Sequence, residues 1–208
     1  MAKEELTPMQ RQYQEMKARN KDCILFFRLG DFYEMFNEDA KLAARELDLT
    51  LTSRDRSKPK EEQTPMCGVP YHSVDAYIAR LVQKGYKVAI CEQMEDPALA
   101  RGLVERDITR IITPGTVTES CMLEESRNNY MGCIYGQSGQ YGLAFCDLST
   151  GAFFATTCAD PRSVASELGR FSPSEVLRFG QGVEEEAVSD ALFRRLNCCV
   201  DEGKAEDF

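Results

Sequence analysis

The chain lacks several residues and patterns that mark particular classes of protein. It has no tryptophan and one histidine, His72, among 208 residues. Its nine cysteines contain no C-x-x-C pair, so a zinc site of cysteine and histidine has little to draw on. Their number is odd and most stand in apolar stretches, which is typical of reduced thiols that pack as small hydrophobic residues. The adjacent Cys198 and Cys199 are the exception, since vicinal thiols can oxidise together.

Long apolar runs and phosphate-binding motifs are absent as well. No apolar run approaches the roughly 18 residues that cross a bilayer. The start, MAKEELTPMQ, lacks the basic flank and apolar core of a secretory signal, so we expect a cytosolic (cytoplasmic) protein. No G-x-x-x-x-G-K-[ST] motif occurs, because Gly203-Lys204 is followed by alanine. We therefore expect no cofactor and no catalytic activity in this chain.

The charge of the chain is negative and unevenly distributed. The net charge of −9 disfavours a protein that coats nucleic acid without regard to sequence. Residues 1–120 hold 18 Lys+Arg and 20 Asp+Glu, whereas residues 121–208 hold 7 and 14. If one half contacts DNA, the sequence favours the first.

Strands alternate with helices in residues 1–116, which predicts an α/β sheet domain. Thr7-Pro8-Met9-Gln10 is typical of a capping-box helix start, and the apolar run CILFFRL that follows is typical of a buried central strand. The remaining predicted elements are a helix that begins directly after Gly30-Asp31, a short strand at 49–52, a helix from about Ser73, and strands at 87–91 and 108–112.

A different pattern begins after a polar stretch that we assign as a linker, residues 117–127. Apolar runs at 130–135, 141–148 and 152–157 are separated by short turns, which predicts an antiparallel meander. A helix at 162–171, a strand at 176–179 and a helix at 187–196 follow. The tail DEGKAEDF belongs to no predicted element, so we expect the second domain, 128–208, to be incomplete.

The segment GDFYEMF, residues 30–36, has two interpretations. In the structural one, Asp31 caps a helix with Glu34 at its third position, and Phe32 is one more core aromatic beside Met35 and Phe36. In the functional one, Phe32 points out of the first turn and is available to a partner.

Four segments in the same order resemble the MutS family of DNA mismatch-repair proteins. They are GDFYEMF (30–36), TPMCGVPYHSVDAY (64–77), VAICEQ (88–93) and VERDITRIITPGT (104–116). Residues 128–180 resemble the connector domain of that family. The resemblance implies a mixed-sheet α/β mismatch-recognition domain followed by a ribonuclease-H-like α/β connector domain.

The resemblance also assigns roles to two residues. Phe32 corresponds to the phenylalanine that is wedged between bases from the minor groove, and Glu34 to the glutamate that contacts a mispaired base. An apolar ring replaces part of the stacking that is lost when a base step opens. Mispaired bases are easier to unstack than paired ones. Discrimination between mismatched and matched DNA therefore depends on how easily the duplex deforms, not on which bases are present. A carboxylate weakens binding to sound duplex and gains a hydrogen bond only at a mispair.

Basic side chains are the candidates for contacts with the DNA backbone. Residues 54–60 carry four cations against one acid, which fits either a solvated loop or a phosphate-contacting one. Arg106 and Arg110, in the segment 104–116, are weaker candidates for the same contacts. His72 is interpreted as a turn or cap residue. The backbone candidates are Arg54, Arg56, Lys58, Lys60, Arg106 and Arg110.

The resemblance implies further properties of a longer parent protein. The family's ATPase region lies downstream of the connector, so ATP and Mg are expected only in the full-length parent, together with self-association. A MutL-type protein is the expected partner of the connector, beside mismatched double-stranded DNA.

Two alternatives from other classes remain at this point. Asp147 stands in an apolar strand beside a meander, and with Glu167 and Glu175 it could form a metal-dependent nuclease site. The acidic residues 128–208 could instead form a stand-alone protein-interaction module.

Overall fold

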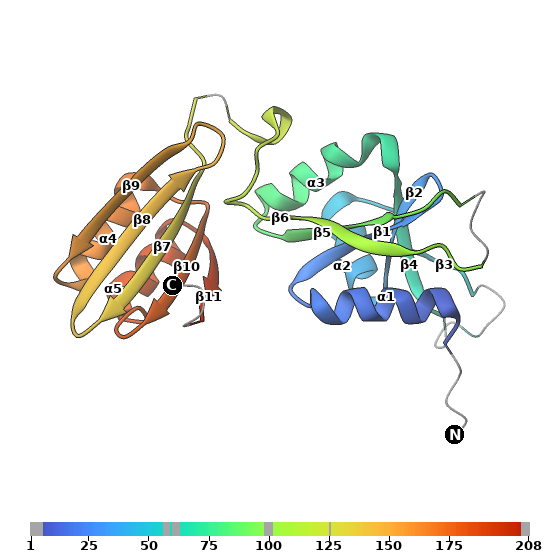
Figure 1. The fold of residues 1–208 in the computed structure, drawn as a ribbon, viewed down its shortest axis with the longest axis horizontal. Helices are drawn as coiled ribbons and strands as arrows, with labels where there is room; N and C mark the ends of the chain where they lie inside the picture. Colours follow the sequence, from blue (N-terminus) through green and yellow to red (C-terminus); the bar gives the residue numbers. More distant parts are fainter. Residues whose placement is uncertain (1–5, 56–58, 60–62, 98–101, 125, 205–208) are drawn as a thin grey trace, which may run out of the picture. The chain divides into compact units, whose positions relative to one another are not determined.

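Two sheets organise the chain, one in each of the units formed by residues 1–112 and 113–208 (Figure 1). The computed structural model describes residues 6–55, 59, 63–97, 102–124 and 126–204. The predicted linker, 117–127, falls in the second unit and contains one turn of 3-10 helix, Ser120–Met122. Among the described helices, none combines the length and apolar character that a membrane span requires.

The first helix, α1 (Pro8–Arg19), confirms the predicted capping box. The Thr7 hydroxyl accepts the N–H of Gln10 at 3.3 Å, and the Gln10 side chain accepts the N–H of Thr7 at 2.9 Å. Such a cap contributes about 1 kcal/mol. Tyr13 and Met16 form its buried face.

The first sheet is built around the apolar strand β1 (Cys23–Leu29), whose predicted bounds are confirmed. Its six strands lie in the order β3-β4-β2-β1-β5-β6, with β1 parallel to β5 and the other pairs antiparallel. The other strands are β2 (Phe32–Phe36), β3 (Thr52–Ser53), β4 (Pro65–Pro70), β5 (Lys87–Gln93) and β6 (Arg106–Ile112).

Helices pack on both faces of this sheet. Tyr13 and Met16 of α1 share a cluster with Leu25 and Phe27, the alternate residues of β1 that face it. On α2 (Asn37–Leu47) the carbonyl of Ala40 accepts from the thiol of Cys67, and α3 (Val74–Gln83) packs against α2. Burial on both faces explains why β1 has almost no polar residue.

The predicted helix directly after Gly30-Asp31 is wrong. Residues Phe32–Phe36 form the strand β2, and α2 begins only at Asn37. Gly30 has a φ of +59°, which turns the chain back so that β2 pairs with β1. Pairing on both sides of β2 outweighs the local capping signal of Asp31 and Glu34. The predicted capping box there is therefore also wrong.

The strand β4 was not predicted, and its two prolines explain why. Proline donates no ladder hydrogen bond and normally argues against a central strand. Here Pro65 and Pro70 stand at the two ends of the strand, so the interior keeps its donors. The predicted short strand at 49–52 is observed as Thr52–Ser53.

The second sheet confirms the predicted meander. Its order is β11-β10-β7-β8-β9, in which β7, β8 and β9 are antiparallel, β10 is parallel to β7, and β11 is parallel to β10. Three antiparallel strands followed by parallel ones are the arrangement of ribonuclease-H-like folds. The strands are β7 (Tyr130–Gln137), β8 (Gln140–Asp147), β9 (Ala152–Cys158), β10 (Glu175–Gly180) and β11 (Cys199–Glu202).

The helices of the second unit contribute to its core on one side of this sheet. Val164 and Leu168 of α4 (Pro161–Phe171) share a buried cluster with Phe145 and Val176. The predicted helix at 187–196 is observed as α5 (Glu186–Ser189) continued by a π-helical segment, Asp190–Arg195.

The tail was predicted to belong to no element, and for its first two residues this is wrong. Asp201 and Glu202 belong to β11, where they pair with Leu177 and Arg178. Two adjacent acids carry no strand pattern in the sequence. Backbone pairing with β10 decides their conformation.

Candidate nucleic-acid interface

Phe32 is an exposed aromatic ring on an anchored backbone. It begins β2 and pairs with Leu29 of β1 on one side and Pro70 of β4 on the other. Its side chain nevertheless remains 47% exposed, while Met35 and Phe36 of the same strand are buried. The interpretation of Phe32 as a core aromatic is therefore wrong.

Arg28 and Tyr71 fix the turn that presents Phe32. The guanidinium carbon of Arg28 lies 4.0 Å from the ring centre of Tyr71, and its Nε donates to the carbonyl of Gly30 at 2.5 Å. The N–H of Tyr71 donates to the carbonyl of Asp31 at 2.9 Å. Sequence reasoning missed both residues, although Arg28 is the single charge in an apolar strand.

Tyr33 and Glu92 also stabilise this turn, on the face of the sheet that carries Arg28. The Tyr33 hydroxyl donates to Glu92, and a carboxylate oxygen of Glu92 lies 3.8 Å from Arg28. Burial and then the Glu92 hydrogen bond raise the pKa of Tyr33 to about 12, so the hydroxyl stays a donor at neutral pH. The segment after Gly30 is thereby connected to β5.

Glu34 lies two residues beyond Phe32 on the same face of β2, opposite to the face of Tyr33 and Arg28, and its side chain is largely buried. The Nη2 atom of Arg54 lies 3.1 Å from each of its carboxylate oxygens, and Oε1 accepts a hydrogen bond from it. Oε2 is buried and has no hydrogen-bond partner among the described residues. Gly68 is the cross-strand neighbour on β4, where a β-carbon would stand 3.5 Å from Cγ of Glu34.

Of the predicted backbone-contacting cations, the structure leaves two on the surface and one in the interior. The side chain of Arg54 is 45% exposed, and Arg110 is exposed on the edge strand β6. Arg106 is buried, which disfavours its prediction as a DNA-backbone contact. Three of the predicted cations, Arg56, Lys58 and Lys60, lie outside the described residues.

Arg106 has an internal role instead. Its guanidinium donates to the carbonyl of Arg28 at 2.7 Å and to the side chain of Gln12 at 2.9 Å. Its carbon lies 5.0 Å from the ring centre of Phe27. Burial lowers the pKa of this guanidinium, and the hydrogen bonds compensate for its desolvation. Arg106 therefore ties α1 to the strand that leads to the Phe32 turn.

His72 is exposed in a 3-10 turn, Tyr71–Ser73, between β4 and α3. Its ring lies edge-on to that of Tyr71 at 5.8 Å. This placement agrees with its interpretation as a turn residue.

The eight cysteines whose side chains the structure describes are free thiols, and five of them are buried. Burial raises the pKa of Cys91 to about 12, which keeps that thiol protonated. Cys198 and Cys199 lie next to each other as free thiols, and the Sγ atom of Cys198 donates to the carbonyl of Cys199 at 3.3 Å.

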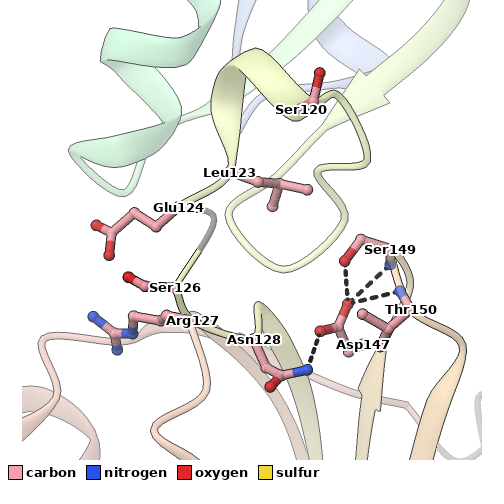
Figure 2. A pocket seen from close by; sticks show the side chains of 9 residues that line it. All are labelled: Ser120, Leu123, Glu124, Ser126, Arg127, Asn128, Asp147, Ser149 and Thr150. Carbon is pink, nitrogen blue, oxygen red and sulfur yellow. Dashed lines mark hydrogen bonds between the residues drawn. The ribbon is translucent and has the colours of Figure 1, made fainter.

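In the second unit, Asp147 lines an open polar pocket of about 370 Å³ (Figure 2). Its carboxylate is fully buried and accepts from Ser149 Oγ at 2.6 Å, from Asn128 Nδ2 at 2.7 Å, and from backbone N–H groups. Burial raises the pKa of Asp147, but the hydrogen bonds from Ser149 and Asn128 prevail and lower it to about 2. Asp147 is thus an ionised acceptor that holds the end of β8.

The carboxylates of the nuclease alternative are not brought together. Asp147 pairs with Tyr130 and Glu175 with Met131, so β7 separates them. Glu167 forms an ion pair with Arg170 within α4. Two-metal hydrolysis needs carboxylates that converge on one point, which these three do not.

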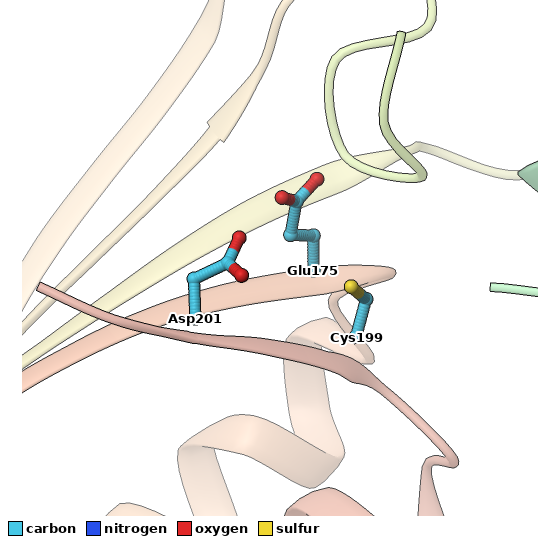
Figure 3. Close-up of side chains that lie close together, drawn as sticks. All are labelled: Glu175, Cys199 and Asp201. Carbon is cyan, nitrogen blue, oxygen red and sulfur yellow. The ribbon is translucent and has the colours of Figure 1, made fainter. Parts of the chain in front are cut away.

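Glu175 lies instead beside Cys199 and Asp201, with ligand atoms within 4.8 Å of one another (Figure 3). It accepts from the N–H of Gly115 at 2.8 Å and from the hydroxyl of Thr113. Burial, with a contribution from Asp201, raises the pKa of Glu175 above its usual range. A raised pKa favours the protonated form of Glu175, which reduces its repulsion with Asp201.

A mixed-sheet α/β unit followed along the chain by a ribonuclease-H-like unit defines the chain as a two-domain α/β protein. Residues 7–121 match the family description MutS domain I, and residues 129–208 match MutS domain II. The chain belongs to the MutS family.

Curated relatives agree with this assignment. The DNA mismatch repair protein MutS of Acetivibrio thermocellus is 54% identical over 198 residues, which are 94% of this chain and 22% of that protein. The protein of the same name from Ruminiclostridium cellulolyticum is 52% identical with the same coverage. That of Clostridium tetani is 56% identical over 173 residues, or 83% of this chain and 19% of that protein. The chain thus spans about a fifth of the length of these relatives.

Proposed function

We propose that this chain recognises mispaired or unpaired bases in duplex DNA by inserting Phe32 from the minor groove. The observation that carries the proposal is the contrast between the anchored backbone of Phe32 and its 47% exposed ring. Other strand aromatics, Phe153 and Phe154, are exposed as well, but Phe32 adjoins a turn that Arg28 and Tyr71 fix, so its ring is presented rigidly. The names of the relatives support a role in mismatch repair.

The physical mechanism is a test of duplex deformability. A ring inserted at a base step replaces part of the stacking that the step loses, and it stabilises a kink. A mispaired step opens at lower free energy than a paired one, so the inserted complex forms preferentially there. The contacts of Arg28 and Tyr71 keep the turn at Gly30 rigid when the Phe32 ring is inserted between bases.

Glu34 is proposed as the contact to the mispaired base. Its Oε2 is a buried acceptor that makes no hydrogen bond among the described residues, although it lies 3.1 Å from Nη2 of Arg54 in an ion pair. A donor on a mispaired base satisfies such an acceptor. A paired base has its donors engaged and offers none.

We further propose that the chain is part of a longer mismatch-repair ATPase that self-associates and contacts a MutL-type protein through the second unit. The excess of acidic residues in 121–208 supports a protein-contacting role for that unit, because it disfavours DNA. Crosslinking of this chain to a MutL-type protein without DNA is the expected result. If no crosslink forms in the second unit, the proposed contact between this chain and a MutL-type protein is wrong.

Glu34→Ala is expected to affect discrimination more than overall affinity in the full-length protein that we propose. The ratio of affinities for a G·T or unpaired-base duplex over a matched duplex should fall about tenfold, since a hydrogen bond to a charged group is lost. Fluorescence anisotropy with the two duplexes across salt concentration measures this ratio. Asp107→Ala, an exposed acid in the same unit, is the control and should leave the ratio unchanged. An unchanged ratio in Glu34→Ala would remove Glu34 from the mechanism.

A further inference from the structure

We infer that Arg54 limits mismatch discrimination, because it screens the Glu34 carboxylate on sound duplex and leaves it at a mispair. This inference rests on the proposed function and adds a residue and a step to it. In the free chain the two side chains form an ion pair, so the probe approaches DNA with its acidic charge compensated.

The geometry shows why Arg54 is the screening residue. Its Nη2 lies 3.1 Å from both oxygens of Glu34, and its guanidinium carbon lies 6.0 Å from the ring centre of Phe36 on the same strand. The Glu34 side chain is 14% exposed, whereas that of Arg54 is 45% exposed. Arg54 is therefore the more accessible member of the pair.

Arg106, another cation near this face among the described residues, makes its hydrogen bonds elsewhere. Arg106 donates to the carbonyls of Arg28 and Val104 and to Gln12, and it lies against Phe27, the β1 neighbour of Glu34. It is buried, so it has little freedom to follow a carboxylate that moves. Among the described residues, Arg54 is therefore the cation that compensates the negative charge of Glu34.

The pair responds differently to the two kinds of duplex. On a matched duplex no base offers a donor, the pair stays closed, and the repulsion between Glu34 and phosphates is small. At a mispair, the base donates to Oε2 and Arg54 is released. The ion pair thus reduces discrimination, because it protects the matched complex from the charge of Glu34.

The test is a double-mutant cycle in the full-length protein, with Arg54→Met, Glu34→Gln and the double variant. Arg54→Met should raise the ratio of mismatched to matched affinity about two- to fivefold, by weakening the matched complex. The same substitution should leave the ratio unchanged in the Glu34→Gln background. Arg54→Lys keeps the charge and should keep the parent ratio.

The control is Arg110→Met, which removes an exposed cation of the same unit. It should weaken both duplexes equally if Arg110 contacts phosphate. The inference is overturned if Arg54→Met behaves in that way, with the slope of log affinity against log salt falling by about 0.9. A lowered ratio, or a shift that persists in the Glu34→Gln background, overturns it too.

Failure of the inference and failure of the proposed function are distinguishable. If Phe32→Ala and Glu34→Gln leave the ratio unchanged, the proposed function itself fails. If both change it and Arg54→Met shows no dependence on Glu34, only the screening role of Arg54 fails.

Discussion

Phe32→Ala is expected to abolish the preference of the full-length protein for a G·T or unpaired-base duplex over a matched one. Stacking of a base on an aromatic side chain contributes about 1–3 kcal/mol, so affinity for the mismatched duplex should fall roughly 10- to 100-fold. Affinity for the matched duplex should change little, because the ring is not inserted there. Equilibrium binding to both duplexes measures the effect.

The fold should survive this substitution. Phe32 is 47% exposed and its backbone pairs are kept, so the free energy of unfolding should change by no more than about 0.5 kcal/mol. Leu51→Ala is the matched control, since Leu51 is an equally exposed apolar residue of the same unit. It should leave the mismatch preference intact. If Phe32→Ala also leaves it intact, the wedge assignment is wrong.

Asp147→Ala is expected to destabilise the second unit by about 2–3 kcal/mol. The carboxylate accepts side-chain donors from Ser149 and Asn128 and several backbone N–H groups, and its removal leaves these donors without their acceptor. Water in the pocket satisfies some of them, which keeps the loss below that of a dry site. Hydrogen exchange of amides in β7 and β8 measures the change.

The same carboxylate predicts a pH dependence with a definite sign. The folded pKa is lowered from 3.8 to about 2, so the stabilisation is present above pH 4 and is lost as the pH falls from about 4 to about 2. A shift of this size corresponds to at most about 2.4 kcal/mol, and we expect about 1–2 kcal/mol because solvent in the pocket screens the charge. In Asp147→Ala this part of the acid dependence should disappear.

Asp160→Ala serves as the control for burial. Asp160 also accepts backbone N–H groups, those of Arg162 and Ser163, but it is exposed at the start of α4. Its loss should destabilise the unit less than the loss of Asp147, because Asp160 is an exposed helix cap. An equal effect of the two substitutions would contradict the special role of the buried carboxylate. Cleavage of DNA by this chain with Mg²⁺ or Mn²⁺, abolished by Asp147→Asn, would revive the nuclease alternative.

Elements with strong local signals were predictable from sequence. The capping box at Thr7, the apolar strand Cys23–Leu29 and the meander from Tyr130 were all confirmed. In each case the local signal and the tertiary environment agree. The segment after Gly30 is the opposite case, because its helix-capping signal was overridden by strand pairing on both sides.

Site residues were predictable only in part, because their partners are distant in sequence. Arg106 looked like a surface cation, but it is buried against Phe27 and bonded to Arg28, 78 residues away. Arg28 and Tyr71 carry no motif that announces their contact. The ion pair of Glu34 with Arg54 likewise arises only when β4, which follows the loop, pairs with both β2 and β3.

The sequence by itself determined the family, the two-part organisation into an α/β unit and a ribonuclease-H-like unit, and the identity of Phe32 and Glu34 as candidates. These depend on motif order and on periodic burial, which are local properties of the chain. Only the tertiary structure decided that Phe32 is exposed on a strand, that Arg106 is internal and that Arg54 compensates Glu34. Exposure and charge pairing depend on which strands and side chains become neighbours after folding, and no local pattern contains that information.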